Sequence, residues 1–244
     1  MNASAERRVV AATMGPTIHD VHAWRFTVAP GLIEVRADPA RFRPMHDPAG
    51  RGLHLSCGAA LVNLRLAAAQ LGHEAVVRLL PDSGCPTLLA AVRLAARRHR
   101  VTRSERLLFA ATLRPFPARR RPSGGAPPLS VLNELAEAAR LEGATLHTLP
   151  ASGDGLCKAV LTTQGDSPAE WLRAGQALQR VLLSGASRSV SASFMYEVVD
   201  VPGVQDLVQH GDFPQVVLEL ASTALPERAE GRERERQGDP DRVG

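Results

Sequence analysis

The longest apolar stretch of the chain runs from Cys57 to Leu71 and is almost free of polar side chains. The polar residues inside it are Asn63, Arg65 and Gln70. A segment that would be apolar on every face of a helix predicts a helix that is buried nearly all round. Ser56 before this stretch and Gly72 after it predict an N-terminal cap and a stop, so we expect a helix from Cys57 to Leu71.

A second long buried helix is predicted from Pro168 to about Ser184. Ser167 offers a capping hydroxyl, and proline is favoured in the first turn of a helix. Apolar positions at helical spacing predict four more helices, at 6–13, 103–113, 129–141 and 201–209.

Short apolar segments bounded by turn residues predict strands. These segments are 24–28, 32–37, 74–80, 88–95, 144–149, 159–163 and 215–220. Helices and strands alternate without the regular rhythm of a parallel βαβ sheet. The pattern therefore favours an α+β sandwich.

Two segments have compositions that indicate a linker and a tail rather than packed structure. Residues 117–128 contain four prolines and two glycines, which is typical of a mobile linker. From 226 onward arginine and glutamate alternate with few apolar residues, so we expect a disordered tail. The resulting division is 1–116, a linker at 117–128, a second region at 129–225 and a tail at 226–244.

Length and composition fit a globular protein. With 244 residues and 44% apolar content, the chain can bury one large core or two small ones. Cys57, Cys85 and Cys157 are odd in number and far apart, so they predict neither a disulfide framework nor a zinc knuckle. No run of eighteen apolar residues and no signal-peptide layout is found, and we expect a cytoplasmic protein without a membrane partner.

The basic charge is concentrated in one part of the chain. Ten arginines lie between Arg93 and Arg121, against the single acid Glu105. Such a stretch either contacts phosphates of a nucleotide or nucleic acid, or forms a solvated helix and loop surface. Because aromatic residues make up only 4% of the chain and bases stack on aromatic rings, we favour the solvated surface over a nucleic-acid partner.

Three motifs resemble a known family. Residues 14–26 read Met-Gly-Pro-Thr-Ile-His-Asp-Val-His-Ala-Trp-Arg-Phe, which resembles the Ala-Pro-Ser-x-x-Asn-x-Gln-Pro-Trp segment of nitroreductase-type flavoproteins. Residues 55–61, Leu-Ser-Cys-Gly-Ala-Ala-Leu, narrow the resemblance to the Acg-type branch, known mostly from actinobacteria. A third, gapless match covers residues 162–180.

The resemblance implies a nitroreductase-like α+β sandwich with a mixed, mainly antiparallel sheet. It implies flavin mononucleotide (FMN) as cofactor and NAD(P)H as a partner of an FMN-dependent oxidoreductase. Acg-type chains are similar to two fused nitroreductase halves, and here the match covers about residues 8–150 and 156–220. The second half is therefore expected to be reduced, and a homodimer is expected to complete the fold.

The resemblance also implies which residues bind the flavin. Pro16, Thr17, Ile18, Asp20 and His22 occupy the positions that line the flavin pocket in the family. Thr17 keeps the hydroxyl of the family's serine. Asp20 replaces an asparagine, which removes an NH₂ donor and adds a negative charge beside the flavin carbonyl groups.

On the phosphate side, the family's Arg-Arg-Thr-Asn-Arg-x-Pro-Phe run matches residues 109–116. Arg114, Pro115 and Phe116 are recognisable in this run, and Arg114 is the expected phosphate contact, because a guanidinium forms paired bonds with phosphate. The family's anchoring arginines fall on Phe109, Ala110 and Leu113. FMN is therefore expected to bind weakly or to have been lost.

His19, Asp20 and His22 also suggest a metal site, because they place three possible ligands within four residues. No fourth ligand lies nearby in the sequence, and the family match accounts for these positions without a metal. We therefore favour pocket or surface polarity.

Two other positions carry a chemical and a structural interpretation. Cys57, near the predicted start of its helix, is either a reactive thiol or an inert buried one, and its apolar neighbours favour the second. His46 and Asp47 are either a catalytic pair or part of a turn that Asp47 holds before Pro48, and the turn is the simpler interpretation.

Three functions follow from these observations. The first is an FMN-dependent oxidoreductase, in which the protein orients the flavin. The second is a degenerate flavin-fold protein that acts by flavin sequestration or protein interaction without catalysis. The third is an arginine-rich, nucleic-acid-associated protein.

Overall fold

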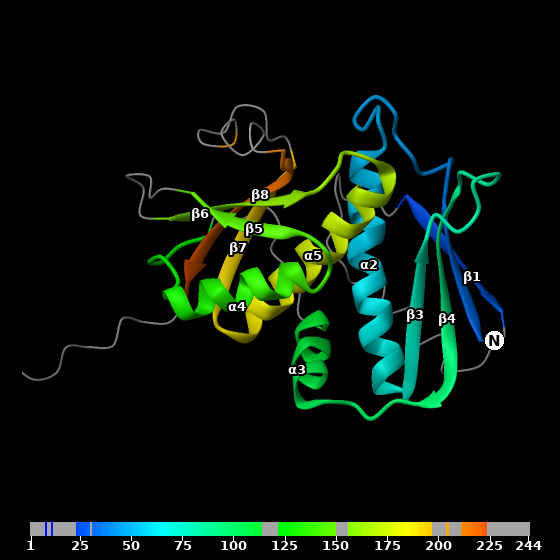
Figure 1. Cartoon of the computed structure of the whole chain (residues 1–244), viewed down its shortest axis with the longest axis horizontal. Coiled ribbons are helices and arrows are strands. Elements are labelled where there is room, and N and C mark those ends of the chain that lie inside the picture. Colours follow the sequence, from blue (N-terminus) through cyan, green and yellow to red (C-terminus); the bar gives the residue numbers. More distant parts are fainter. Residues whose placement is uncertain are drawn as a thin grey trace, which may run out of the picture.

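The computed structural model describes residues 8, 11, 23–29, 31–113, 122–149, 156–196, 204 and 211–223. Within these residues, two four-stranded sheets lie on either side of two long helices, α2 and α5 (Figure 1). Neighbouring strands in both sheets are antiparallel. The expected α+β class is confirmed.

The first sheet has the strand order β1-β2-β4-β3. Its region consists of β1 (Trp24–Ala29), β2 (Leu32–Ala37), α2 (Arg51–Gln70), β3 (His73–Leu79), β4 (Leu88–Arg98) and α3 (Arg103–Thr112). Each of these elements had been predicted, with bounds that differ by a few residues except at the start of α2.

The second sheet has the strand order β5-β6-β8-β7. Its region consists of α4 (Leu129–Arg140), β5 (Thr145–Thr148), β6 (Cys157–Thr163), α5 (Pro168–Ser187), β7 (Val190–Met195) and β8 (Phe213–Ser222). No strand had been predicted at β7. Its residues include Ser191 and Ser193, which have weak strand preference, and it pairs along its whole length with β8.

The two regions repeat one arrangement. In each, two strands precede a 20-residue helix and two follow it, and the fourth strand lies between the second and the third. The connection after α2 ends with Gly72 at φ +78, and the connection after α5 ends with Ser189 at φ +56. Both connections hold two residues, so α2–β3 and α5–β7 match without a gap.

The repeat brings α2 and α5 into direct backbone contact. A Cβ added to Gly58 would lie within 3.0 Å of the Leu172 carbonyl oxygen, and a Cβ added to Gly175 would do the same at the Leu55 carbonyl oxygen. The two contacts are reciprocal, since Leu55 and Leu172 occupy equivalent positions in the two helices. Glycine is therefore required on both sides of the crossing.

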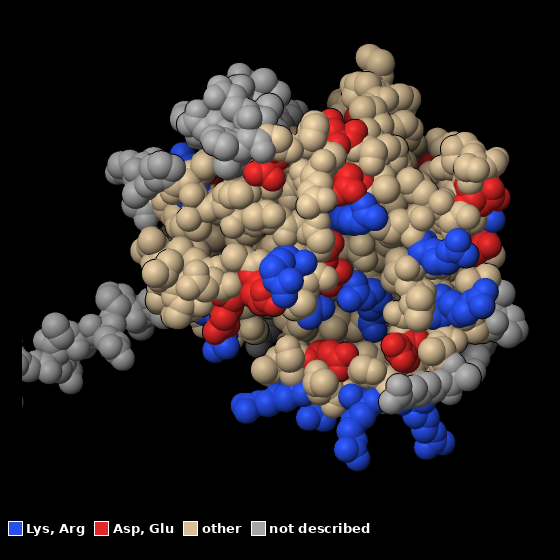
Figure 2. All heavy atoms as spheres, in the orientation of Figure 1, with Lys and Arg blue, Asp and Glu red and all other residues tan. Residues whose placement is uncertain are grey.

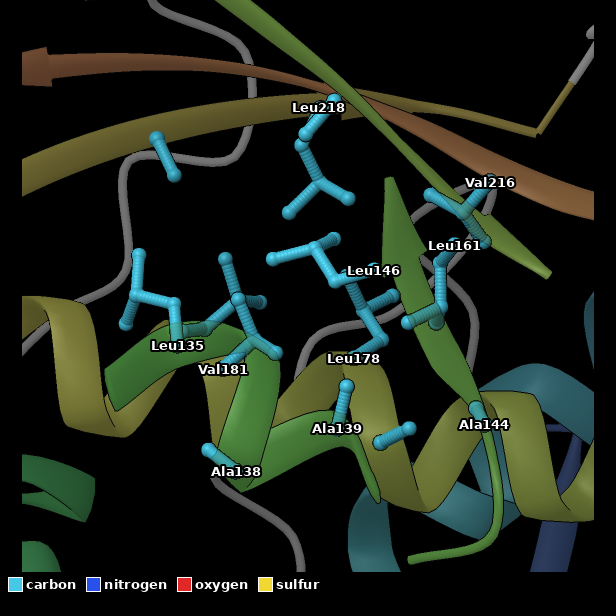
Figure 3. Packing of buried hydrophobic residues seen from close by; sticks show 14 of the residues in the cluster. Leu135, Ala138, Ala139, Ala144, Leu146, Leu161, Leu178, Val181, Val216 and Leu218 are labelled. Carbon is cyan, nitrogen blue, oxygen red and sulfur yellow. The ribbon is translucent and has the colours of Figure 1, made fainter. Parts of the chain in front are cut away.

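Both helices begin at the same end of the molecule and then diverge, with α3 between their far ends (Figure 1). There Leu108 and Ala111 of α3 share a buried cluster with Val62, Leu66 and Leu183. Between α4, α5 and the second sheet, Leu135, Leu178 and Leu218 point into one apolar layer (Figure 3). Each sheet is thus packed on its own helix, and the helix pair joins the two cores.

The helix α2 begins at Arg51, earlier than predicted, and Ser56 is a buried residue inside it rather than its cap. The carboxylate of Asp47 accepts hydrogen bonds from the backbone N–H groups of Gly52 (3.1 Å) and Leu53 (2.9 Å). Asp47 thereby satisfies backbone donors of the first turn and stabilises the earlier start.

Among the described helices, α2 is the one whose length and composition would allow it to cross a membrane. Most of its apolar window, 83%, is buried inside the protein, as in the core helix of a globular fold.

Replacing Gly58 or Gly175 with alanine should destabilise the protein by about 3 kcal/mol, because the new methyl group meets a carbonyl of the facing helix that cannot move aside. Gly185→Ala is the matched control. Its Cβ would lie 3.5 Å from the Val190 Cβ, an ordinary contact, and alanine favours the helix. Urea unfolding followed by circular dichroism measures all three, and a Gly58→Ala protein as stable as the control would contradict the crossing.

Candidate functional site

The residues predicted to bind flavin lie outside the part of the chain that the structure describes. They are Pro16, Thr17, Ile18, Asp20, His22 and Arg114. The structure does describe the residues at which these segments enter the fold, which are Ala23 and Trp24 on one side and Leu113 on the other.

Trp24, which follows the predicted flavin segment in the sequence, lies in the core. It is buried in the same cluster as Cys57 and Leu61 of α2 and Leu172 of α5. The backbone N–H of Asp38 donates to the Ala23 carbonyl at 2.8 Å. Trp24 is therefore a core residue beside the crossing of α2 and α5.

At the starts of α2 and α5, five side chains form a polar cluster, which we call the helix-start cluster. Its members are Arg51, His54, Asp166, Trp171 and Gln215. The Arg51 guanidinium donates to both carboxylate oxygens of Asp166, at 2.7 and 2.9 Å. It also donates to Gln215 Oε1 at 3.1 Å. The Trp171 indole N–H donates to the same Asp166 carboxylate at 2.5 Å.

The aromatic rings of this cluster come from equivalent positions of the two helices. His54 meets Trp171 edge to face, with ring centroids 5.6 Å apart, and the Arg51 guanidinium lies 5.5 Å from the Trp171 ring centroid. His54 Nδ1 lies 2.6 Å from the Gly50 carbonyl oxygen, which can only accept, so Nδ1 carries the hydrogen. Burial lowers the pKa of His54, which keeps the ring neutral near pH 7.

A second ion cluster joins the regions beyond the crossing. Glu142 follows α4, and its side chain is only 4% exposed. It accepts from Arg65 of α2 at 2.6 Å and from Arg180 of α5 at 3.3 Å. The arginines nearest the helix pair are thus neutralised by carboxylates within the protein.

One buried guanidinium is different. Arg8 is 5% exposed, and within the described residues its Nε and Nη1 atoms are buried without a hydrogen-bond partner. Burial lowers its pKa.

The positions of the family's anchoring arginines are described in part. Phe109 packs against the cluster around Leu108, whereas Ala110 and Leu113 are exposed on the outer side of α3. No cationic side chain lies at these three positions.

The three cysteines are free thiols. Cys57 is fully buried in α2, and burial raises its pKa far above the usual range, so it is an inert core residue. Hydrogen bonds with Thr87 and Arg36 lower the pKa of Cys85, whose sulfur lies 3.3 Å from Arg36 Nη1. Partial burial raises the pKa of Cys157.

Basic side chains gather at the end of the molecule where α3 begins (Figure 2). Arg98, Arg100, Arg103 and Arg106 are exposed there. The acid between them, Glu105, accepts from the Thr102 backbone N–H at 2.8 Å and lies 2.9 Å from His99 Nε2. The described arginines of this stretch are thus exposed to solvent.

Within the described residues, no group of three His, Cys, Asp or Glu side chains could hold a metal ion. His19, Asp20 and His22 lie outside that part. Asp47 is engaged at the start of α2, which supports its structural interpretation over a catalytic pair with His46.

The sequence analysis missed the helix-start cluster. Asp166 and Trp171 lie inside the gapless 162–180 match, and Arg51 lies before Cys57, where the sequence analysis placed the start of the helix. No spacing rule pairs residues so far apart in the chain. Only the crossing of α2 and α5 brings them together.

Two proteins of Mycobacterium tuberculosis, from strains CDC 1551 and H37Rv, are similar to the chain, and the names of both assign them provisionally as NAD(P)H nitroreductases. Each is 41% identical over 71 residues, which is 29% of this chain and 21% of the relative. The chain thus spans about a fifth of their length in this match. No protein-family model matches the chain.

A crystal structure from Anabaena variabilis, named provisionally as a nitroreductase, has a similar fold. The TM-score is 0.57 with 11% identity, over 78% of this chain and 69% of that one. The chain therefore has a nitroreductase-like fold.

Asp166→Asn should destabilise the protein, and a double-mutant cycle with Arg51→Met should give a coupling of about 1 kcal/mol. The pair is bidentate, but Asp166 is 40% exposed and solvent screens it. Glu137→Gln, in the exposed Arg140 pair, is the control and should change little. Thermal unfolding gives the coupling; additive effects of the two substitutions would show that the pair does not connect the regions.

Proposed function

We propose that the chain is a nitroreductase-like oxidoreductase that binds FMN, takes electrons from NAD(P)H and acts in the cytoplasm. The observation that carries this proposal is the 41% identity to the two mycobacterial proteins, whose names state NAD(P)H nitroreductase. The nitroreductase-like fold of the described residues supports it.

In this proposal the chain belongs to the Acg-type branch and contains two related halves. The shared strand order of the two sheets and the matching α2–β3 and α5–β7 units support that interpretation. The proposed division into 1–116, 117–128, 129–225 and 226–244 follows the same arrangement.

Pro16, Thr17, Ile18, Asp20 and His22 would hold the flavin ring, and Arg114 would contact its phosphate. FMN supplies the electron transfer when it is bound; the protein positions the ring and limits access of water. Trp24, two residues after His22, is buried against both helices of the central pair.

The absorbance spectrum of the purified protein between the near ultraviolet and the blue tests the cofactor directly. Bound flavin with NAD(P)H oxidation in the presence of an electron acceptor supports the oxidoreductase. A colourless protein that does not take up added FMN would overturn the proposal.

A second candidate is a flavin-fold protein without catalysis, which sequesters flavin or contacts another protein. It is supported by the apolar residues Phe109, Ala110 and Leu113 at the positions of the family's arginines. Flavin that binds but is not reduced by NAD(P)H would favour this candidate.

Asp20→Asn should tighten FMN binding by about 1–2 kcal/mol, or roughly 5- to 30-fold, because it replaces a repelled carboxylate with a hydrogen-bond donor. The gain should shrink at low pH, where a protonated Asp20 donates by itself. Fluorescence titration measures the affinity, with Asp82→Asn in an exposed turn as control. Equal affinities at neutral pH would place the flavin pocket elsewhere.

We also propose that the chain forms a homodimer, which would cover apolar surface of a reduced second half. Leu107 of α3 and Leu113, which follows α3, are exposed in the first half, and they support a further contact between the two copies there. Light scattering after size exclusion should give a dimer at micromolar concentration, and Leu107→Glu with Leu113→Glu should weaken it. A wild-type monomer without aggregation would contradict the dimer.

A further inference from the structure

The strand β3 (His73–Leu79) forms one edge of the first sheet. It ends the strand order β1-β2-β4-β3, and within the described residues it pairs with β4 on one side and with no strand on the other (Figure 1). The Leu80 N–H donates to the carbonyl of Leu89, the residue opposite it, at 2.9 Å. Because hydrogen-bonded pairs alternate along an antiparallel ladder, the N–H and C=O groups of Ala75 and Val77 point away from β4. These are the groups that a further strand would pair with.

The exposed side chains of β3 make this edge complementary to itself. Glu74, Val76 and Arg78 are exposed on one face of the strand, with the valine at the centre and opposite charges on either side. Within the part of the chain that the structure describes, neither Glu74 nor Arg78 has an ion-pair partner. The partner that matches this pattern is therefore a second, antiparallel copy of the same strand.

We propose that β3 pairs with β3 of a second copy about a two-fold axis at Val76. In this register each Glu74 lies opposite Arg78 of the other copy, the two valines face each other, and Ala75 exchanges hydrogen bonds with Val77. The inference rests on the homodimer proposed above and adds to it a contact between the two first sheets.

Neighbouring registers lack this match. With the axis at Ala75, Glu74 faces Val76, and with the axis at Val77, Val76 faces Arg78. Opposite charges directly across a pair of strands stabilise it, so the register centred on Val76 is favoured over both.

The ends of β3 limit the pairing to a closed dimer. Gly72 has φ +78 and Leu80 has φ +43, so the backbone leaves the extended conformation at both ends, and Pro81 follows. A two-fold contact uses the same edge of both copies, which leaves no β3 edge for a third copy. The strand at the other edge of the sheet, β1, exposes Arg25 and Thr27 and carries no such pair of opposite charges.

Charge exchange tests the proposal. Glu74→Arg and Arg78→Glu should each raise the dissociation constant of the dimer roughly tenfold or more, because each turns two attracting pairs into two repelling ones. The double variant should dimerise like the wild type. An equimolar mixture of the two single variants should also dimerise, since both cross-strand pairs then carry opposite charges. Analytical ultracentrifugation gives the dissociation constants, and circular dichroism checks the fold.

Two controls separate this edge from other surfaces. Arg25→Glu, on the opposite edge strand, should leave the dissociation constant unchanged. In the wild type, hydrogen exchange of the Ala75 and Val77 amides should slow as the protein concentration rises through the dissociation constant. Exchange of the Val76 amide, which points toward β4, should not follow the concentration in this way.

The outcomes distinguish this contact from the proposed function. A dimer that both single variants leave unchanged, or amides of Ala75 and Val77 that are insensitive to concentration, overturns the edge pairing and leaves the homodimer with another interface. A wild-type monomer overturns both. A dimer that follows the charge exchange in a protein that takes up no flavin supports the edge pairing while the flavoprotein proposal fails. Single variants that dissociate but regain no dimer in the mixture or in the double variant overturn the Glu74–Arg78 register.

Discussion

The reciprocal contact between α2 and α5 is the constraint on which the described fold depends. Each helix carries its own sheet, so the distance between the helices sets the distance between the sheets. Gly58 and Gly175 allow the two backbones to touch, and the facing carbonyls of Leu172 and Leu55 leave no room for a methyl group. A close-packed crossing of this kind has one arrangement rather than a range of them.

Polar groups then define the two ends of this contact. Arg51 and Asp166 join the helix starts, and Glu142 joins Arg65 to Arg180 farther along. Because partly buried pairs depend on geometry, they favour one relative rotation of the regions more than they add stability. Trp24, which follows the predicted flavin segment in the sequence, packs beside this contact.

Most elements could be predicted from the sequence because their signals are local, as with Ser167-Pro168 at the start of α5 and Gly72 after α2. The start of α2 was predicted too late, since Asp47 caps it from outside the apolar stretch. β7 was missed because pairing with β8, rather than its own residues, makes it a strand. The helix-start cluster could not be predicted from the sequence either, because a tertiary contact brings its residues together. The flavin-binding positions rest on motif resemblance and stay predictions.

The common direction of α2 and α5 has an electrostatic consequence. Aligned peptide dipoles place a partial positive charge at the start of each helix, and two such charges at one end repel each other. Asp47 lies at the start of α2, and Glu170 lies in the first turn of α5, with Asp166 just before that helix. These carboxylates act as local counterions for the backbone, which allows two parallel helices to begin side by side in a single chain.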